Sequence, residues 1–293
     1  MVGTSLSPIA LPKSEELTNA LIAPGPTLVD RSEFDQLRAD LEARLAAASA
    51  TLPGDRPLRV DGYRLGHPDP LEDEAKPFEW GLRTARRPLG LDCARQCVAD
   101  RRVHPVDAAQ AVVAGLIGRA AQGAERPGSL GEWLAALTNG ARGVVQAEAV
   151  GWASKLVTTL DWARLPRPII GADRSVVFPA APQVLLRGRI EVRVSTASRS
   201  QAPTGTGRTE CLFLMMTGRP SPSSDVELGL PALTVACDPR RPAVPVRVIG
   251  WWPECGRAQV VPVDLRLLER TVERVVETVT IAATQRRNDP IAA

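Results

Sequence analysis

The spacing of apolar residues in the first half of the chain is that of amphipathic helices. Apolar side chains over 34–45 recur at intervals of three and four residues, which is the period of one helix face. Similar spacing predicts further helices over 91–100 and 106–121, and a short helix followed by a long one over 129–162. We therefore predict an extended or mobile arm over 1–29, which lacks this period and contains four prolines, followed by an α-helical N-terminal region over 30–128.

After about residue 165 the pattern changes to that of strands. Short apolar or alternating runs separated by polar turns predict strands, and longer runs with helical spacing predict helices between them. The run 211–217 is apolar throughout, which is typical of a strand buried on both faces. Residues 129–293 are thus predicted to form an α/β core, a mixed sheet flanked by helices. The predicted strands cover 168–178, 184–194, 211–217, 244–252 and 257–263, and the predicted helices cover 223–236 and 264–285.

The composition is that of a globular protein without a membrane span. Hydrophobic residues make up 44% of the 293 positions and charged residues 24%. No apolar run reaches the roughly 18 residues that a spanning helix needs, and the first residues have neither the basic nor the apolar region of a secretory signal. Five cysteines, an odd number and scattered, fit a reducing compartment. We expect a cytoplasmic protein with no membrane partner.

Two of the cysteines leave an alternative open. Cys93 and Cys97 lie one helical turn apart, a spacing that metal ligands can use, but no other cysteine or histidine stands at a matching interval. Packing inside a helix is the favoured interpretation, with a metal site as the alternative.

Arginine carries nearly all of the positive charge. Only Lys13, Lys76 and Lys155 are lysines, so 36 − 3 = 33 of the basic residues are arginine. Residues 1–162 hold 18 basic and 21 acidic residues, a balance of −3, whereas 163–293 hold 18 and 12, a balance of +6. The guanidinium fork suits phosphate and carboxylate groups, so the basic second half favours nucleic acid as a partner. An arginine-rich proteome is the alternative explanation.

Basic side chains converge on one predicted strand. Alternation along 185–194 places Arg187, Arg189 and Arg193 on one face, together with Glu191. A solvent-exposed face with the glutamate in salt bridges explains the same pattern. The tandem Trp251-Trp252 at the end of a later strand is predicted to lie in the core, with base stacking as the alternative.

The order of segments after residue 185 resembles a known nuclease family. The succession R-G-R-I-E, a polar loop, L-F-L-M-M-T-G-R-P, a helix with E-L-G-L-P-A-L and a strand entering G-W-W-P is similar to the PD-(D/E)XK nuclease superfamily, in particular its RecB-like branch. The resemblance covers about residues 129–285 and implies a restriction-endonuclease-like fold. In that branch a strand of type G-[RK]-I-D supplies a metal-binding acid, the next strand reads roughly D-Y-K-T-G, and the following helix carries Q-L-x-x-Y.

The signature side chains of that family are present in part. By the resemblance, Glu191 stands at the position of the first-strand acid, and Thr217-Gly218 match the T-G of the second strand. Glu148, on the preceding helix, matches a helix carboxylate that some family members add to the metal site. The remaining signature positions are not matched: Leu214 replaces the second acid, Met216 the lysine, Gly229 the glutamine and Leu233 the tyrosine, and no lysine follows Lys155.

These replacements bear on the chemistry that the resemblance implies. Phosphodiester hydrolysis of this kind needs carboxylates that hold Mg²⁺, and a lysine that orients the nucleophile or steadies the charge of the transition state. We therefore expect a non-catalytic, nuclease-like protein without a metal or cofactor. It binds DNA or docks onto a partner, such as a helicase or nuclease in DNA repair, recombination or defence. The arginines expected to contact DNA are Arg187, Arg189, Arg193, Arg199, Arg208 and Arg219.

Two other functions stay open. One is an active metal-dependent DNA nuclease in which Glu191 and Glu148 are catalytic, Mg²⁺ is the cofactor and an arginine replaces the lysine. The other is a protein-interaction scaffold with no affinity for nucleic acid. Exposure of the arginine face distinguishes DNA binding from the scaffold, because phosphate contacts need accessible cations.

Overall fold

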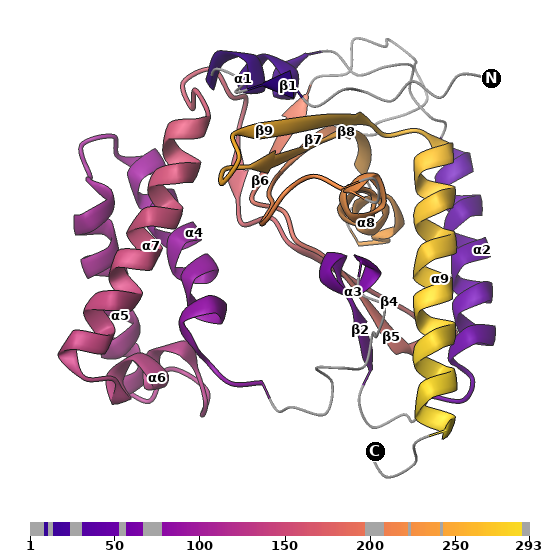
Figure 1. Cartoon of the computed structure of the whole chain (residues 1–293), viewed down its shortest axis with the longest axis horizontal. Helices are drawn as coiled ribbons and strands as arrows, with labels where there is room; N and C mark the ends of the chain where they lie inside the picture. Colours follow the sequence, from indigo (N-terminus) through magenta and orange to yellow (C-terminus); the bar gives the residue numbers. More distant parts are fainter. Residues whose placement is uncertain are drawn as a thin grey trace. The chain divides into compact units, whose positions relative to one another are not determined.

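The chain folds into two compact units. The sheet unit comprises Met1–Pro77 and Leu165–Ala293, and the helical unit comprises Phe78–Arg164 (Figure 1). The predicted class, α/β with mixed sheets flanked by helices, is confirmed. The computed structural model describes residues 9–10, 14–23, 31–52, 57–66, 78–196, 208–221, 224–240 and 243–288.

The sheet unit is built around a large mixed sheet. Its strands are β1 (Ile9–Ala10), β3 (Ile169–Ile170), β6 (Val192–Thr196), β7 (Arg208–Met215), β8 (Ala243–Trp252) and β9 (Arg257–Pro262). They lie in the order β1-β9-β8-β7-β6-β3, and neighbours are antiparallel except β7 and β8, which are parallel. A parallel pair needs a crossover connection, which the helix α8 (Ser224–Cys237) supplies. Side chains on both faces of β7 are buried, as its apolar run predicts.

A smaller sheet lies in the same unit. It consists of β2 (Leu58–Val60), β4 (Arg174–Phe178) and β5 (Ala181–Gly188) in the order β2-β5-β4. β5 pairs parallel with β2 and antiparallel with β4. β2, and the helix α3 (Gly62–Gly66) that follows it, are too short to show a period in the sequence, so neither is predicted.

The prediction of a single strand over 184–194 is wrong. β5 ends at Gly188 before β6 begins, so the chain leaves the small sheet and enters the large one between the two strands. Asp173 holds this turn, because its Oδ1 accepts the backbone amide of Ile190 at 2.9 Å. α8 packs closely against Gly188 at the end of β5, since a Cβ on Gly188 would lie 2.8 Å from Pro231 Cα. The alternation that placed three arginines and a glutamate on one face is therefore interrupted.

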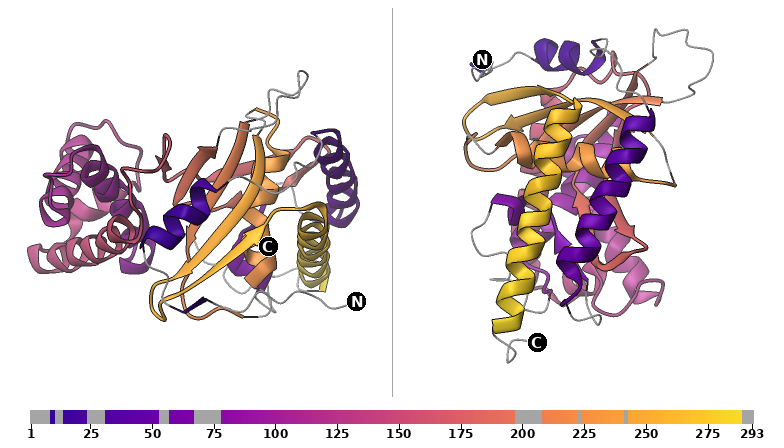
Figure 2. Two further views of the ribbon diagram at one scale, coloured as in Figure 1. Left: turned by 90° about the horizontal axis from the view of Figure 1, so that it is seen from above. Right: turned by 90° about the vertical axis from the view of Figure 1, so that its right-hand side faces the viewer.

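Helices cover both faces of the large sheet. α1 (Ser14–Ile22) lies on one face, where the Arg247 guanidinium of β8 donates to the carbonyl oxygen of Ala20. α8 lies on the opposite face, where a Cβ on Gly250 would meet Leu228 Cδ2 at 2.7 Å. Figures 1 and 2 show α2 (Arg31–Ser49) and α9 (Leu265–Asn288) side by side, and α9 packs against α8.

The helical unit contains α4 (Leu82–Ala99), α5 (Pro105–Ala121), α6 (Leu130–Ala136) and α7 (Asn139–Thr159). Three of these helices begin at a side-chain cap: His104, Ser129 and Thr138 each accept a backbone amide at the start of α5, α6 and α7. α4 packs on α7, where Gly90 faces the ring of Trp152. The predicted helices are confirmed, although α4 begins earlier than predicted. In the described part of the chain, every helix is too short or too polar to cross a membrane.

The boundaries of the two units differ from the predicted division of the chain. α2 packs on α9 in the sheet unit, whereas the prediction assigned 30–128 to one helical region. α6 and α7 belong to the helical unit, whereas the prediction assigned 129–293 to the α/β core. β1 and α1 fall within the predicted arm 1–29. An amphipathic period predicts that a helix forms and buries a face, but does not identify the surface that it covers.

Candidate functional site

Glu191 lies at the turn where the chain passes from the small sheet to the large one. Its side chain is only 3% exposed, and its Oε2 accepts the backbone amide of Met215 at 3.0 Å. Its own backbone amide donates to the carbonyl oxygen of Phe213 at 3.1 Å, and its carbonyl accepts the amide of Gly171 at 2.8 Å. The carboxylate is therefore fixed at the end of β7, where it satisfies the backbone.

The side chains around this carboxylate are suited to packing. Leu214 and Leu233 are buried, and they occupy the positions where the resemblance expects the second acid and the helix tyrosine. A Cβ on Gly229 would collide with Thr271 Oγ1 of α9, so a glutamine cannot stand there unless that side chain shifts. Met216 replaces the lysine, and its amide donates to the carbonyl of Trp251 at 2.7 Å. These positions bring α8, α9 and the sheet into close contact.

The described residues contain no cluster of three or more His, Cys, Asp or Glu side chains that could hold a metal ion. Mg²⁺ prefers oxygen ligands, and one of the two oxygens of the Glu191 carboxylate already accepts the Met215 amide. Glu148 is exposed on α7 and belongs to the helical unit, whereas Glu191 belongs to the sheet unit. The two predicted catalytic carboxylates therefore lie in different compact units.

Arg193 forms a buried ion pair. Its Nη1 lies 2.7 Å from Glu210 Oε1 on the neighbouring strand β7, and the two side chains are 11% and 2% exposed. Arg193 stands opposite Leu212 in the register of β6 and β7, so the pair is diagonal on one face of the sheet. A charge buried against its counterion does not contact a phosphate unless the pair first breaks.

Arg187 and Arg189 are also paired with carboxylates, but nearer to solvent. Arg187 Nη2 lies 3.4 Å from Asp173 Oδ2, and Arg189 Nη2 lies 3.6 Å from Asp61 Oδ2, with arginine side chains 33% and 49% exposed. Asp61 also accepts Arg59 Nη2 at 2.9 Å. These arginines remain accessible, but carboxylates neutralise part of the charge that a phosphate would meet.

The three other arginines predicted to contact DNA are described to different extents. Arg219 is exposed and follows Gly218, a residue with φ of 74° whose amide donates to Glu254 Oε2 at 3.1 Å. Arg208 begins β7, and only its backbone is described. Arg199 lies outside the described residues. Of the predicted set, only Arg187, Arg189 and Arg219 are seen with accessible guanidinium groups.

The tryptophan pair and the cysteine pair both belong to hydrophobic cores. Trp251 and Trp252 are buried, which confirms the predicted core position and leaves no accessible ring for a base. Burial raises the pKa of the Cys93 thiol to about 12, with a smaller contribution from Cys97, and burial also raises the pKa of Cys97. Among the residues that the structure describes, no group of three or more His, Cys, Asp or Glu side chains that could hold a metal ion includes these two thiols.

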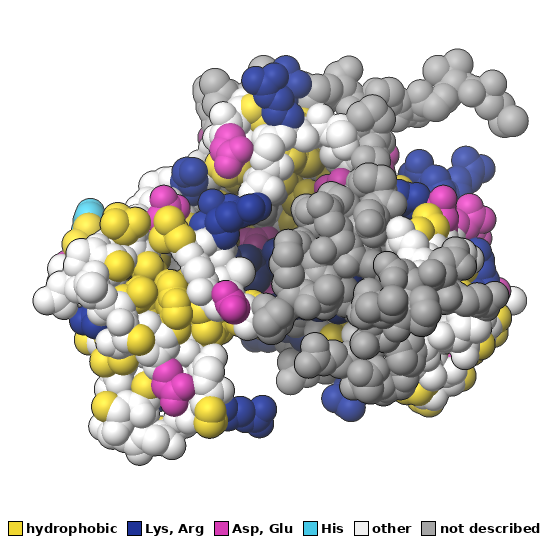
Figure 3. Space-filling view, turned by 60° about the horizontal axis from the view of Figure 1, so that its bottom comes forward, with side chains coloured by type: hydrophobic (Ala, Val, Ile, Leu, Met, Phe, Trp, Pro, Cys, Tyr) yellow, Lys and Arg dark blue, Asp and Glu magenta, His cyan; other side chains and the backbone are white. Residues whose placement is uncertain are grey.

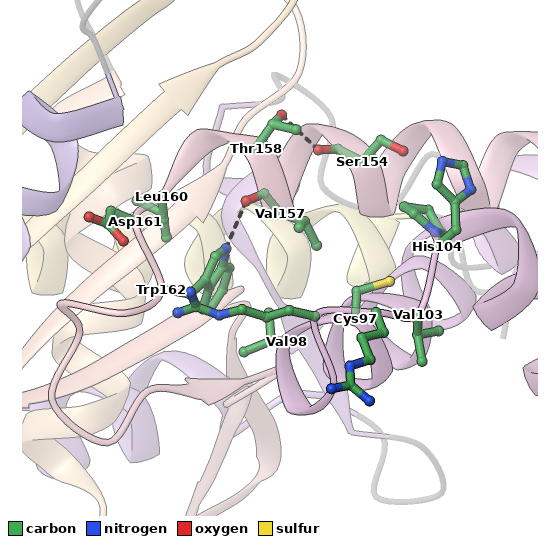
Figure 4. Close-up of a pocket in the computed structure, with 13 residues that line it drawn as sticks. Cys97, Val98, Val103, His104, Ser154, Val157, Thr158, Leu160, Asp161 and Trp162 are labelled. Atoms are coloured by element: carbon green, nitrogen blue, oxygen red, sulfur yellow. Dashed lines mark hydrogen bonds between the residues drawn. The ribbon is translucent and has the colours of Figure 1, made fainter.

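A second concave site, which sequence reasoning missed, lies in the helical unit. It is a cavity of about 520 Å³ between the ends of α4 and α7 and the start of α5 (Figure 4). Arg101, Arg102 and His104 lie on its lining. The adjacent arginines after a helix are visible in the sequence, but only the fold brings them to the tryptophan that closes the cavity, Trp162.

The two sites differ in what they can do chemically. The Glu191 carboxylate is buried and accepts the Met215 amide, and the described residues hold no group of three or more His, Cys, Asp or Glu side chains for a metal, so this arrangement is suited to stabilising the fold. The cavity of the helical unit offers cations beside apolar walls, which is suited to binding. No protein-family model and no curated protein matches the chain, so the residues alone indicate the function.

Proposed function

We propose that the protein is a non-catalytic, nuclease-like accessory protein of DNA repair, recombination or defence, which docks onto a partner such as a helicase or nuclease. One observation carries this proposal: the Glu191 carboxylate is buried, and its Oε2 accepts the Met215 amide. A carboxylate that binds the backbone in this way is suited to a structural role, and the described residues hold no group of three or more His, Cys, Asp or Glu side chains that could bind a metal for hydrolysis.

The topology supports the nuclease-like part of the proposal. The segments that carry the resemblance lie, in order, at the end of β5 and in the turn after it, in β7, in α8 and in β8. β6, β7 and β8 are neighbours in the large sheet, with an antiparallel pair followed by a parallel pair that α8 connects. This strand order, with a parallel pair joined by a helix, supports the proposed nuclease-like fold.

Protein docking is favoured by the surface of the helical unit. Apolar side chains gather on one face of this unit in Figure 3, and its large exposed apolar residues are Phe78, Leu82, Val106 and Val144. Exposed apolar groups of this kind are typical of surfaces that bind another protein. The arginines of the predicted DNA-binding face, in contrast, are paired with carboxylates.

The experiment that tests the loss of catalysis is an incubation of end-labelled single- and double-stranded DNA with Mg²⁺, Mn²⁺ or EDTA. We expect intact DNA under all conditions. The matched variants are Glu191→Gln, which keeps an oxygen to accept the Met215 amide, and Glu148→Gln on the helical unit. Metal-dependent cleavage that is lost in Glu191→Gln would contradict the proposal and establish an atypical nuclease. Affinity purification of the full chain should then recover a helicase or nuclease, and recovery of neither contradicts the docking role.

DNA binding is the second candidate function, favoured by the accessible side chains of Arg187, Arg189 and Arg219. Replacing all three by alanine should lower the affinity for DNA and the steepness of its salt dependence, because each phosphate contact releases counterions. A matched variant removes three other exposed arginines of the sheet unit, Arg257, Arg266 and Arg270. Equal losses in the two variants, or no binding by the wild type, would exclude a DNA site at the first three.

A further inference from the structure

The cavity of the helical unit has an apolar floor. Cys97 and Leu160 on its lining are buried, and Cys97 is neutral because burial raises the pKa of its thiol. Trp162 closes one side, and its indole is held in place because Nε1 donates to the carbonyl oxygen of Val157 at 2.8 Å (Figure 4). With its N–H satisfied, the indole presents only its ring system to the cavity. The floor therefore suits an apolar, flat molecule.

The rim of the cavity carries positive charge. Arg101 and Arg102 are both exposed, and neither guanidinium forms an ion pair with any residue that the structure describes. The backbone amide of Arg102 donates to Asp100 Oδ1 at 2.9 Å, which fixes the turn that presents the two side chains. Two adjacent guanidinium groups without counterions are suited to phosphate and carboxylate groups, which they bind with paired hydrogen bonds.

Other polar side chains also border the cavity: Ser154, Thr158, His104 and Asp161. His104 Nδ1 accepts the amide of Val106 at 3.3 Å, so in the neutral ring the proton lies on Nε2, which is then a donor. Asp161 is the acidic side chain on the lining, and its Oδ1 accepts the amide of Ala163 at 3.1 Å. The lining therefore has two guanidinium groups against one carboxylate, and its balance is positive.

We propose that this cavity binds a small organic anion, in which a phosphate or carboxylate group contacts Arg101 and Arg102 and a flat apolar body packs against Trp162 and Leu160. The volume of about 520 Å³ lies within the usual range for sites that bind one such molecule. All of the residues involved belong to the helical unit, so the proposal does not depend on the fate of the nuclease-like site.

The test is isothermal titration calorimetry of the full chain with four probes. 1-Naphthyl phosphate and 1-naphthoate carry the two anionic groups on the same flat body, 1-naphthol lacks the anion, and inorganic phosphate lacks the body. We expect at least one aromatic anion to bind about tenfold or more tightly than naphthol and phosphate, with an affinity that falls as salt is added. Comparison of the phosphate with the carboxylate identifies the preferred head group.

Variants locate the binding. The double variant Arg101→Ala/Arg102→Ala should lower the affinity for the aromatic anion by about tenfold or more, since both charge-assisted contacts are lost. The control Arg83→Ala/Arg126→Ala removes two other exposed arginines of the same unit and should change the affinity by less than about twofold. Trp162→Leu should lower the affinity for both the aromatic anions and naphthol. Circular dichroism of this variant verifies that its helices persist.

Three results would overturn the proposal. They are the absence of binding to the wild type by either aromatic anion, naphthol binding as tightly as the anions, and equal losses in the cavity variant and its control. In each case the cavity is not an anion site.

Discussion

Two groups of arginines illustrate how differently the two units use the same side chain. In the sheet unit, Arg187, Arg189 and Arg193 each lie within ion-pair distance of a carboxylate. In the helical unit, Arg101 and Arg102 border a cavity and have no counterion among the described residues. The three arginines that the more basic half places at the predicted DNA-binding strand are thus partly neutralised, so a charge balance along the chain does not locate a binding surface.

The reason is that ion pairs form between residues that are distant in sequence. Asp61, which precedes α3, contacts Arg189 beyond the end of β5, and Glu210 of β7 contacts Arg193 of β6. A sum of charges over the second half does not show which carboxylate folding places beside which arginine, and it leaves out Asp61, which lies in the first half. The local charge around a guanidinium, rather than the net charge of its segment, decides whether it can bind an anion.

We expect the largest change in stability when the buried ion pair between Arg193 and Glu210 in the sheet unit is broken. Glu210→Gln leaves the Arg193 guanidinium buried against a neutral group, and should lower the free energy of unfolding by about 3–5 kcal/mol. Its counterpart in the helical unit, Arg101→Gln, should change stability by no more than about 0.5 kcal/mol, because that side chain is exposed and has no ion pair among the described residues. Urea denaturation measures the stability of both variants, and hydrogen exchange of β6 and β7 locates the loss in Glu210→Gln.

The double variant Arg193→Met/Glu210→Gln then tests the pairing itself. If the cost of Glu210→Gln arises from an uncompensated charge, removing the arginine as well should recover part of the lost stability. A double variant that is as unstable as the sum of the two single variants would show that the two side chains act independently.

An intermediate effect is expected at the turn that separates the arginines of the sheet unit. Gly188→Ala places a methyl group 2.8 Å from Pro231 Cα, and it should cost about 1–3 kcal/mol because backbone of α8 must move. Gly143→Ala on α7 is the matched change in the helical unit, where a Cβ meets nothing within 4 Å. There, alanine should stabilise the helix by about 0.5–1 kcal/mol. Thermal unfolding of the two variants distinguishes them, and equal shifts would contradict the close packing of α8.

The regular elements of the fold were predictable from the sequence. Periodic apolar residues predicted the helices of the helical unit, the helices α2, α8 and α9 of the sheet unit, and the strands β7, β8 and β9, because each has a long, regular pattern of burial. The break between β5 and β6 was not predictable, because the alternation of polar and apolar residues continues through it. What interrupts the strand is Asp173 and the approach of α8 to Gly188, and neither is encoded in the local pattern.

Less of the candidate site was predictable. The sequence identified Glu191 and the apolar replacements around it, and the buried environment of Leu214 and Leu233 agrees with their expected packing role. It did not reveal that Glu191 binds a backbone amide, or that Arg193 is buried with Glu210. It also missed the cavity of the helical unit, because Arg101 and Trp162 come together only through the packing of α4 against α7.

The smallest expected effect concerns the half-exposed pairs. Arg187→Ala removes the partner of Asp173 and should change stability by about 0–1 kcal/mol, because water and salt screen the pair. Arg189→Ala should matter less still, since Asp61 keeps Arg59 at 2.9 Å. Urea denaturation at low and high salt measures both variants, and added salt should shrink the difference between Arg187→Ala and the wild type. A cost as large as that of Glu210→Gln would mean that the neutralised arginines of the sheet unit behave alike, and that burial does not separate Arg193 from the other two.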